Sequence, residues 1–126
     1  MNTTTWSPAD LDRIGGAEEL RIATRRPDGS LRPYVTIWVV RADDDLYVRS
    51  AHGADNPWFR RATAAGVGRI RAGGVERDVT FAATAPAAHQ DIDRAYHAKY
   101  DRYGPAIVGS VVGARAVPVT IKLLPR

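Results

Sequence analysis

The sequence predicts an α+β protein that is mainly antiparallel β: a six-stranded split β-barrel with a short N-terminal helix, one inserted helix and a longer helix before the last strand. Segments of strand length alternate apolar and polar residues. Short turns rich in glycine, proline and aspartate separate most of them, so consecutive strands are expected to pair antiparallel. Six short strands favour a closed or split barrel over an open sheet with exposed edges. The length of 126 residues suits one domain, residues 1–126.

The N-terminal part predicts a helix followed by a strand. Ser7 can cap a helix whose first position is Pro8, and Gly15-Gly16 ends that helix. Residues 19–26 then alternate apolar and polar side chains, as a half-buried strand does. The turn sequence of residues 27–30 returns the chain toward the sheet.

The next two strands are expected to form a hairpin. Residues 31–41 form the first strand, and its centre, Val35 to Val40, is apolar on both faces, which predicts burial on both sides. Residues 42–45, which include three adjacent aspartates, form the hairpin tip. Residues 46–50 form the second strand, with even-numbered side chains on one face and odd-numbered side chains on the other.

The second half of the chain predicts an inserted helix, another hairpin and the longer helix. Asn56 and Pro57 open the inserted helix over residues 58–65. Strands over residues 67–72 and 75–83 are joined by a two-glycine turn. The remaining elements are a helix over about residues 88–103, one or two helical turns over 106–112 and a last strand over 114–124.

The net charge of +4 is concentrated in one block. Five arginines and one acid lie between Leu46 and Val75, whereas the rest of the chain carries thirteen bases and thirteen acids. Arginine grips phosphate or carboxylate with two parallel hydrogen bonds, which lysine cannot do. A basic pocket for an anionic small molecule is therefore expected, the alternative being five solvated arginines on separate faces. The patch is too small to predict nucleic-acid binding.

Candidate phosphate contacts gather around the loop after residues 46–50. Arg49 and Ser50 lie at the strand end, and a glycine-containing loop leads from there to the helix N-terminus at Asn56. Backbone N–H groups and the helix dipole favour an anion at that point. Ser50 and His52 can add hydrogen bonds, and two arginines lie in the first turns of the helix. The absence of Walker-type and G-x-G-x-x-G patterns excludes a P-loop or Rossmann site.

Aromatic residues near this loop could form a flat wall for a ring. Trp58, at the helix start, is the best placed of them. Trp38 and Tyr47 are further candidates, although aromatic residues on strands are often core.

An acid–base pair is a second candidate chemistry. Tyr96 and Lys99 fall on one face of the longer helix, and a nearby ammonium group lowers the pKa of a phenol. The alternative is a helix packed through its tyrosines, with Lys99 extending its charge to solvent. With no catalytic residue assigned, the candidates are Tyr96, Lys99 and His52.

Composition excludes several other classes. There is no cysteine, and the three histidines have no metal-ligand spacing, so no metal site is expected. No run approaches the roughly 18 apolar residues of a membrane helix, so no membrane partner is expected. The start of the chain lacks the basic and apolar regions of a signal peptide, which makes a cytoplasmic protein the expectation.

Several segments together resemble a bacterial family, the domain of unknown function 2255. The resemblance covers roughly Trp6 to Arg126. The segments that carry it are DGSLRPYVTIWVVRADDDLYVRSAHG, PWFRRA, GRIRAGG, VERDVTF and AYHAKY.

A more remote resemblance concerns the order of LYV-RS, a glycine-bearing loop, Pro-Trp, a short helix and a strand. This order is similar to the deazaflavin (F420)-dependent nitroreductase family and its FMN-binding relatives, which implies a split barrel, an F420 or FMN cofactor and a homodimer with the cofactor near the shared interface. The helix asparagine of that family is absent here. The positions that match its cofactor-phosphate motif are Arg49, Ser50, Gly53, Trp58 and Arg61.

The functional hypothesis is therefore an oxidoreductase that acts on a small organic substrate through a flavin-like cofactor. One alternative is a cofactor-free acid–base enzyme for a small anionic substrate, using Tyr96, Lys99 and His52. Another is a non-catalytic module that binds a phosphorylated metabolite. The residues expected to bind the cofactor are Arg49, Ser50, Gly53, Trp58, Arg60, Arg61 and Trp38.

Overall fold

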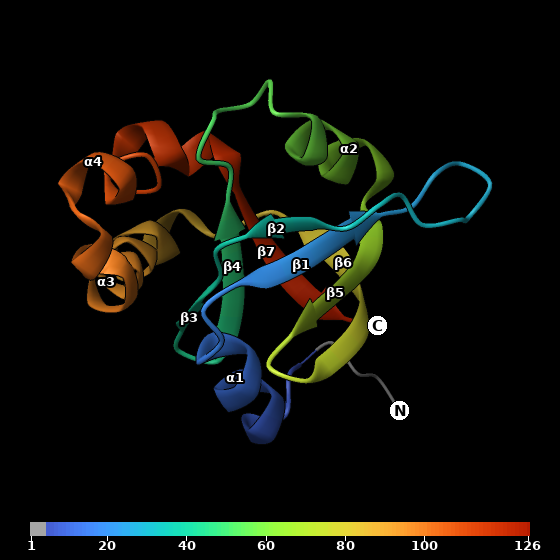
Figure 1. The fold of residues 1–126 in the computed structure, drawn as a ribbon, viewed down its shortest axis with the longest axis horizontal. Helices are drawn as coiled ribbons and strands as arrows, with labels where there is room; N and C mark the ends of the chain where they lie inside the picture. The colour runs from blue at the N-terminus through green and yellow to red at the C-terminus, as the bar shows by residue number, and fades with distance from the viewer. Residues whose placement is uncertain (1–4) are drawn as a thin grey trace.

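The computed structural model describes residues 5–126, and a single curled antiparallel sheet lies at its centre (Figure 1). The strand order is β2-β1-β5-β6-β7-β4-β3, and every pair of neighbours is antiparallel. The sheet therefore agrees with the expected architecture. Its strands are β1 (Leu20–Thr24), β2 (Val35–Ile37), β3 (Val40–Ala42), β4 (Asp45–Arg49), β5 (Val67–Ala72), β6 (Val75–Ala82) and β7 (Thr120–Pro125).

Helices surround the sheet, with α1 and α2 near its opposite ends and α3 and α4 together at one side (Figure 1). No helix of the described part of the chain has the length and apolar character needed to cross a membrane. The expectation that the chain starts without a signal peptide rests partly on residues 1–4, which lie outside the described residues. The helices are α1 (Pro8–Gly15), α2 (Pro57–Ala65), α3 (His89–Tyr100) and α4 (Pro105–Val108), and the 3-10 turns are η1 (Pro86–Ala88), η2 (Asp101–Tyr103) and η3 (Ala114–Val119).

The strand predicted over residues 31–41 is divided between the two edges of the sheet. β2 pairs with β1 and β3 pairs with β4, which gives seven strands instead of six. Val39, between β2 and β3, pairs with no strand because side chains of α3 bond its backbone groups. The Val39 N–H donates to the Tyr100 hydroxyl at 3.3 Å, and Lys99 donates to the Val39 carbonyl at 2.7 Å. Val35 is 37% exposed, so the predicted burial on both sides is wrong for this half of the segment.

The last strand begins at Thr120, six residues later than predicted. Residues 114–119 form η3 instead. Pro118 has no N–H to donate to a neighbouring strand, which favours a turn over a ladder at this point. The Thr120 hydroxyl also donates to the Ala116 carbonyl at 2.7 Å and closes the turn.

Other local predictions are confirmed where the sequence determines the turn. The Ser7 hydroxyl accepts the Asp10 N–H at 3.2 Å and caps α1. Gly66 ends α2 with a positive φ of 72°. The β5–β6 hairpin turns at Gly73 and Gly74, whose φ angles are 56° and 79°, a backbone conformation that glycine adopts without strain.

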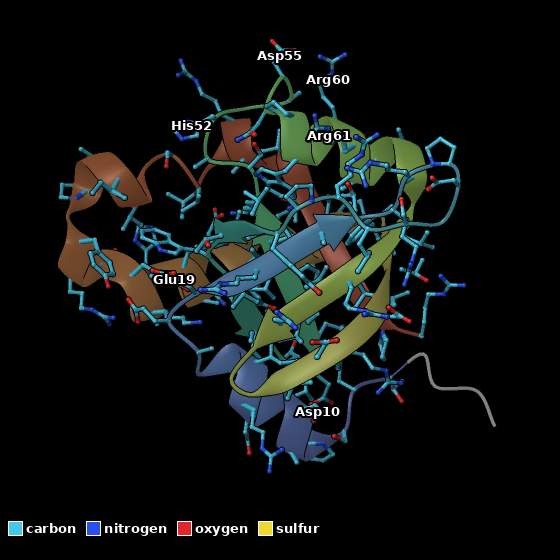
Figure 2. All side chains as sticks on the ribbon, turned by 45° about the vertical axis from the view of Figure 1, so that its right-hand side comes forward. Asp10, Glu19, His52, Asp55, Arg60 and Arg61 are labelled. Atoms are coloured by element: carbon cyan, nitrogen blue, oxygen red, sulfur yellow. The ribbon has the colours of Figure 1, made fainter. Side chains whose placement is uncertain are left out.

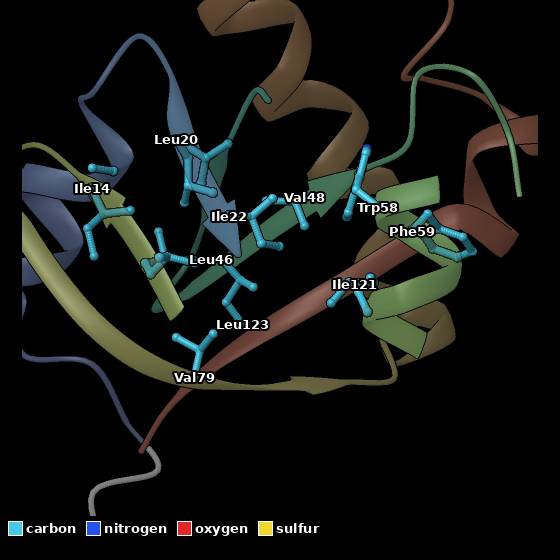
Figure 3. Close-up of a cluster of buried hydrophobic side chains, with 14 of the residues drawn as sticks. Ile14, Leu20, Ile22, Leu46, Val48, Trp58, Phe59, Val79, Ile121 and Leu123 are labelled. Carbon is cyan, nitrogen blue, oxygen red and sulfur yellow. The ribbon is translucent and has the colours of Figure 1, made fainter. Parts of the chain in front are cut away.

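Two apolar clusters lie on opposite faces of β4. Leu46 and Val48 belong to the larger cluster, and Tyr47 belongs to the smaller one, so the predicted alternation is confirmed. The smaller cluster packs β3 and β4 against α3 and the segment after α4. The larger cluster is enclosed by the sheet, α1 and α2; Figure 3 labels Ile14, Leu20, Ile22, Leu46, Val48, Trp58, Phe59, Val79, Ile121 and Leu123.

Candidate functional site

A cavity of about 320 Å³ opens where the edge strand β2, the β4–α2 loop, the start of α2 and the segment after α4 meet. Four residues predicted for the site line it together: Trp38, Arg49, His52 and Trp58. Its volume lies within the usual range of small-molecule sites, about 300–1,000 Å³. The other lining residues are Val35, Thr36, Ile37, Ala51, Asn56, Ile107, Ser110 and Val111.

Two indole rings on this cavity are held by packing. Trp58 is 5% exposed and meets Phe59 edge-on, with ring centroids 5.9 Å apart. Trp38 stacks on Tyr100 with a centroid distance of 3.9 Å and an interplanar angle of 5°. Rings fixed in this way lose little conformational entropy when a flat ligand packs against them.

Tyr100 positions Trp38 through the backbone beside it. Its hydroxyl accepts the Val39 N–H and lies 2.9 Å from the Glu18 carbonyl oxygen. Burial raises the pKa of Tyr100, so the phenol stays protonated and remains a donor at neutral pH. In contrast, the Tyr96 hydroxyl has no hydrogen-bond partner within residues 5–126.

Tyr100→Phe is therefore expected to lower the free energy of unfolding by about 1–3 kcal/mol, because it leaves the buried Val39 N–H without its partner. Tyr96→Phe is the matched control on the same helix, and it should change stability by less than about 0.5 kcal/mol. Urea unfolding of both variants measures the difference. Equal losses in the two would contradict the assigned hydrogen bonds.

Arg49 lines the cavity, and its guanidinium forms hydrogen bonds with groups of the protein itself. It forms an ion pair with Asp93 and donates to the Val111 carbonyl and the Thr120 hydroxyl, each at 2.8 Å. Its side chain is 0% exposed. These contacts fasten α3 and the segment after α4 to the sheet. They occupy most of the guanidinium donors that a phosphate would need.

Two titratable groups lie beside the Arg49 guanidinium. His89 accepts from it, with 3.2 Å between His89 Nδ1 and the nearest guanidinium nitrogen, and burial together with the arginine charge lowers the pKa of His89. Tyr96 lies beneath the guanidinium, 5.6 Å from ring centroid to Arg49 Cζ. Burial raises the pKa of Tyr96, the opposite of the lowering expected from a Tyr–Lys pair.

Lys99 is removed from the cavity and serves the β2–β3 link. Its ammonium donates to the Val39 carbonyl and lies 5.1 Å from the centre of the Tyr100 ring. Burial lowers the pKa of Lys99 to about 8. Since His52 lies on the cavity and neither Tyr96 nor Lys99 lines it, the three candidate catalytic residues do not share one site.

The β4–α2 loop is braced by Ser50. Its hydroxyl donates to the Gly53 carbonyl at 2.6 Å, and its N–H donates to the Val119 carbonyl at 3.1 Å. Gly53 has a φ of 80°, which lets the loop turn tightly. Ser50 and Gly53 therefore shape the loop that carries His52, and neither lines the cavity.

The five arginines of residues 46–75 do not converge. Arg69 and Arg71 lie on β5 and pair with Glu76, and Arg69 also pairs with Asp78. Arg60 projects outward from α2 (Figure 2) and lines neither this cavity nor the one at the other end of α2. Arg61 lines a different cavity, at the other end of α2. A strand sends successive side chains to opposite faces and a helix turns them by 100°, so closeness in sequence did not bring these charges together.

Polar residues that the sequence analysis missed complete the cavity wall. Thr36 on β2, Asn56 before α2 and Ser110 after α4 bring two hydroxyl groups and an amide to it. Ser110 is 54 positions beyond Asn56, and no local pattern relates the two residues. Within residues 5–126 there is no group of three His, Asp or Glu side chains that could hold a metal ion.

The fold places the protein among split-barrel proteins, the class that includes flavin- and F420-binding members. It is similar to a FAD-binding protein from Mesorhizobium loti (TM-score 0.60, 16% identity, 97% of this chain and 91% of that one). It is similar to the FAD and heme binding protein from Mycobacterium smegmatis (TM-score 0.52, 18% identity, covering 98% of this chain and 67% of that one). It is also similar to an F420 reductase (TM-score 0.50, 15% identity, 93% and 91%). At these identities the likeness shows the fold.

The chain belongs to the family described as an uncharacterized protein conserved in bacteria (DUF2255), whose profile matches residues 10–123. The family resemblance of the sequence is thereby confirmed, as is the split-barrel class with one more strand than expected. No curated protein sequence matches the chain significantly.

Proposed function

We propose that this protein binds a flavin-type cofactor, F420 or FMN, with the ring in the cavity of Trp38 and Trp58, and acts as an oxidoreductase on a small organic substrate. The observation that carries the proposal is the pair of fixed indole rings on one cavity of about 320 Å³. The structural neighbours bind FAD, F420 or heme, which supports a cofactor of this kind.

The residues of the cavity fit a flavin ring. The tryptophans offer flat apolar surface, and the side chains of Thr36, Asn56 and Ser110 can hydrogen-bond the polar edge of the ring. When bound, the cofactor would supply the hydride chemistry. The chain would orient the ring, exclude water from one of its faces and leave the other face to the substrate.

A homodimer is part of the proposal. Val35 and Ile107 line the cavity and are 37% and 53% exposed, so large apolar side chains stand at its rim. A second copy packed on this rim would bury them and narrow the entrance. Sedimentation equilibrium tests this directly, and a particle with the 13.7 kDa mass of one chain at all concentrations would count against it.

Isothermal titration calorimetry with FMN and with F420 tests the function. We expect saturable binding of one of the two at one molecule per chain. No heat from either ligand at high micromolar concentration would reject the cofactor proposal.

The acid–base alternative gains no support from the geometry, because Tyr96 is buried and Lys99 bonds a backbone carbonyl away from the cavity. A binding module for a phosphorylated metabolite remains compatible with the same cavity, and turnover of a reduced cofactor distinguishes it from an oxidoreductase.

A further inference from the structure

A second cavity, of about 580 Å³, lies between the loop that joins β1 to β2 and the C-terminal half of α2. Four arginines line it, and no acidic residue does. Three of them, Arg25, Arg26 and Arg32, come from the β1–β2 connection, and Arg61 comes from α2. The other lining residues are Pro27, Gly29, Ala64, Ala65 and Val67.

Most of this positive charge has no carboxylate partner. Arg25 pairs with Asp78 at 3.0 Å, but Asp78 is shared with Arg69 at 2.8 Å. Among residues 5–126, neither Arg32 nor Arg61 has a side-chain hydrogen bond or an ion pair. Like charges held near one another raise the energy of the protein unless an anion lies between them.

Arg26 is likewise left without a carboxylate. Its guanidinium donates to the Leu31 carbonyl at 3.0 Å. The nearest acid of the loop, Asp28, accepts from the N–H and the hydroxyl of Ser30, and these two bonds are the main reason that its pKa is lowered. Asp28 therefore stabilises the turn while the arginines face the cavity.

Hydrogen bonds hold the backbone of the three arginines from the β1–β2 connection. The Arg25 N–H donates to the Val67 carbonyl at 3.3 Å, the Arg26 N–H to the Ser30 carbonyl at 2.8 Å and the Arg32 N–H to the Thr24 carbonyl at 2.9 Å. A backbone held in this way reduces the ordering that binding requires, and several guanidinium groups match the several oxygens of a phosphate.

We infer that this cavity, the arginine cavity, binds the phosphate groups of a phosphorylated ligand. The phosphate could belong to the cofactor proposed above or to a separate phosphorylated substrate. Geometry allows the first source. Trp58 and Arg61 are three residues apart on α2, a rise of about 4.5 Å. Arg32 and Val35 are separated by at most about 11 Å of extended chain. Different residues of α2, and of the segment from Arg32 to Trp38, thus line the two cavities.

The test measures the binding of pyrophosphate to the full chain by isothermal titration calorimetry. Arg32→Gln and Arg61→Gln should each weaken pyrophosphate binding about tenfold, the loss expected for one charge-assisted contact. Arg60→Gln is the matched control, because Arg60 is the neighbour of Arg61 on α2, carries the same charge and lines neither cavity. Circular dichroism confirms that each variant is folded.

Riboflavin and FMN distinguish the two sources of phosphate. If the phosphate is that of the cofactor, both variants weaken FMN binding and leave riboflavin binding unchanged. If it belongs to a separate substrate, pyrophosphate binding falls in the variants and FMN binding does not. Absence of pyrophosphate binding, or an equal loss in Arg60→Gln and Arg61→Gln, would overturn the inference. Because pyrophosphate alone decides it, a failure of flavin binding would leave the inference standing.

Discussion

Arg49→Ala is expected to lower the free energy of unfolding by about 3 kcal/mol. The substitution removes a side chain that is 0% exposed and leaves the carboxylate of Asp93 without its partner. Breaking a buried ion pair in this way costs about 3–5 kcal/mol. The Asp93 side chain is 31% exposed, and water that reaches it places the expected loss at the lower end of that range. The loss is a large part of the stability of a domain of this size, about 5–15 kcal/mol.

Chemical denaturation measured by tryptophan fluorescence tests this expectation. Arg94→Ala is the matched control, because Arg94 also lies in an ion pair of α3, with Asp91, but its side chain is 70% exposed. The free energy of unfolding of Arg94→Ala should fall by about 0.5 kcal/mol or less. If Arg49→Ala were no less stable than Arg94→Ala, Arg49 would not anchor α3 to the sheet, and its role as a direct ligand contact would have to be reconsidered.

Ala51→Trp is expected to weaken cofactor binding at least about a hundredfold. Ala51 lies in the β4–α2 loop, lines the cavity of Trp38 and Trp58 and is exposed, so a large side chain there can fill the cavity without entering the core. Burying a ring of 150–250 Å² contributes about 4–6 kcal/mol to binding. Losing half of this contribution corresponds to about a hundredfold in affinity.

Ala54→Trp gives the matched control for Ala51→Trp. Ala54 lies in the same loop and is exposed, but it does not line the cavity. Calorimetric titration with the cofactor should give the wild-type affinity for this variant and a severe loss for Ala51→Trp. Similar affinities in the two variants would show that the ring binds elsewhere.

Local turn chemistry explains why so much of the fold could be predicted. The α2 helix follows an Asn-Pro start and ends at Gly66, and the β5–β6 hairpin follows two consecutive glycines; their bounds depend on residues within a few positions of the turn. The division between β2 and β3 could not be predicted, because Val39 takes its hydrogen-bond partners from Lys99 and Tyr100, about sixty positions away.

The candidate site was predictable only in part for the same reason. Trp38, Arg49, His52 and Trp58 were singled out for their chemistry, and the fold brings them to one cavity. The wall after α4 was missed because Ser110 has no local signature. Arg49 was expected to contact a phosphate, but its guanidinium bonds Asp93. This partner lies in α3, 44 positions further along the chain, where no local pattern relates it to Arg49.

The crystal structure of the protein with its bound cofactor tests the central claim most directly. The ring is predicted to lie against Trp38 and Trp58, with its polar edge near Asn56 and Ser110 and with the Arg49–Asp93 ion pair intact. A ring outside this cavity, or a phosphate bound by Arg49 in place of Asp93, would contradict the account.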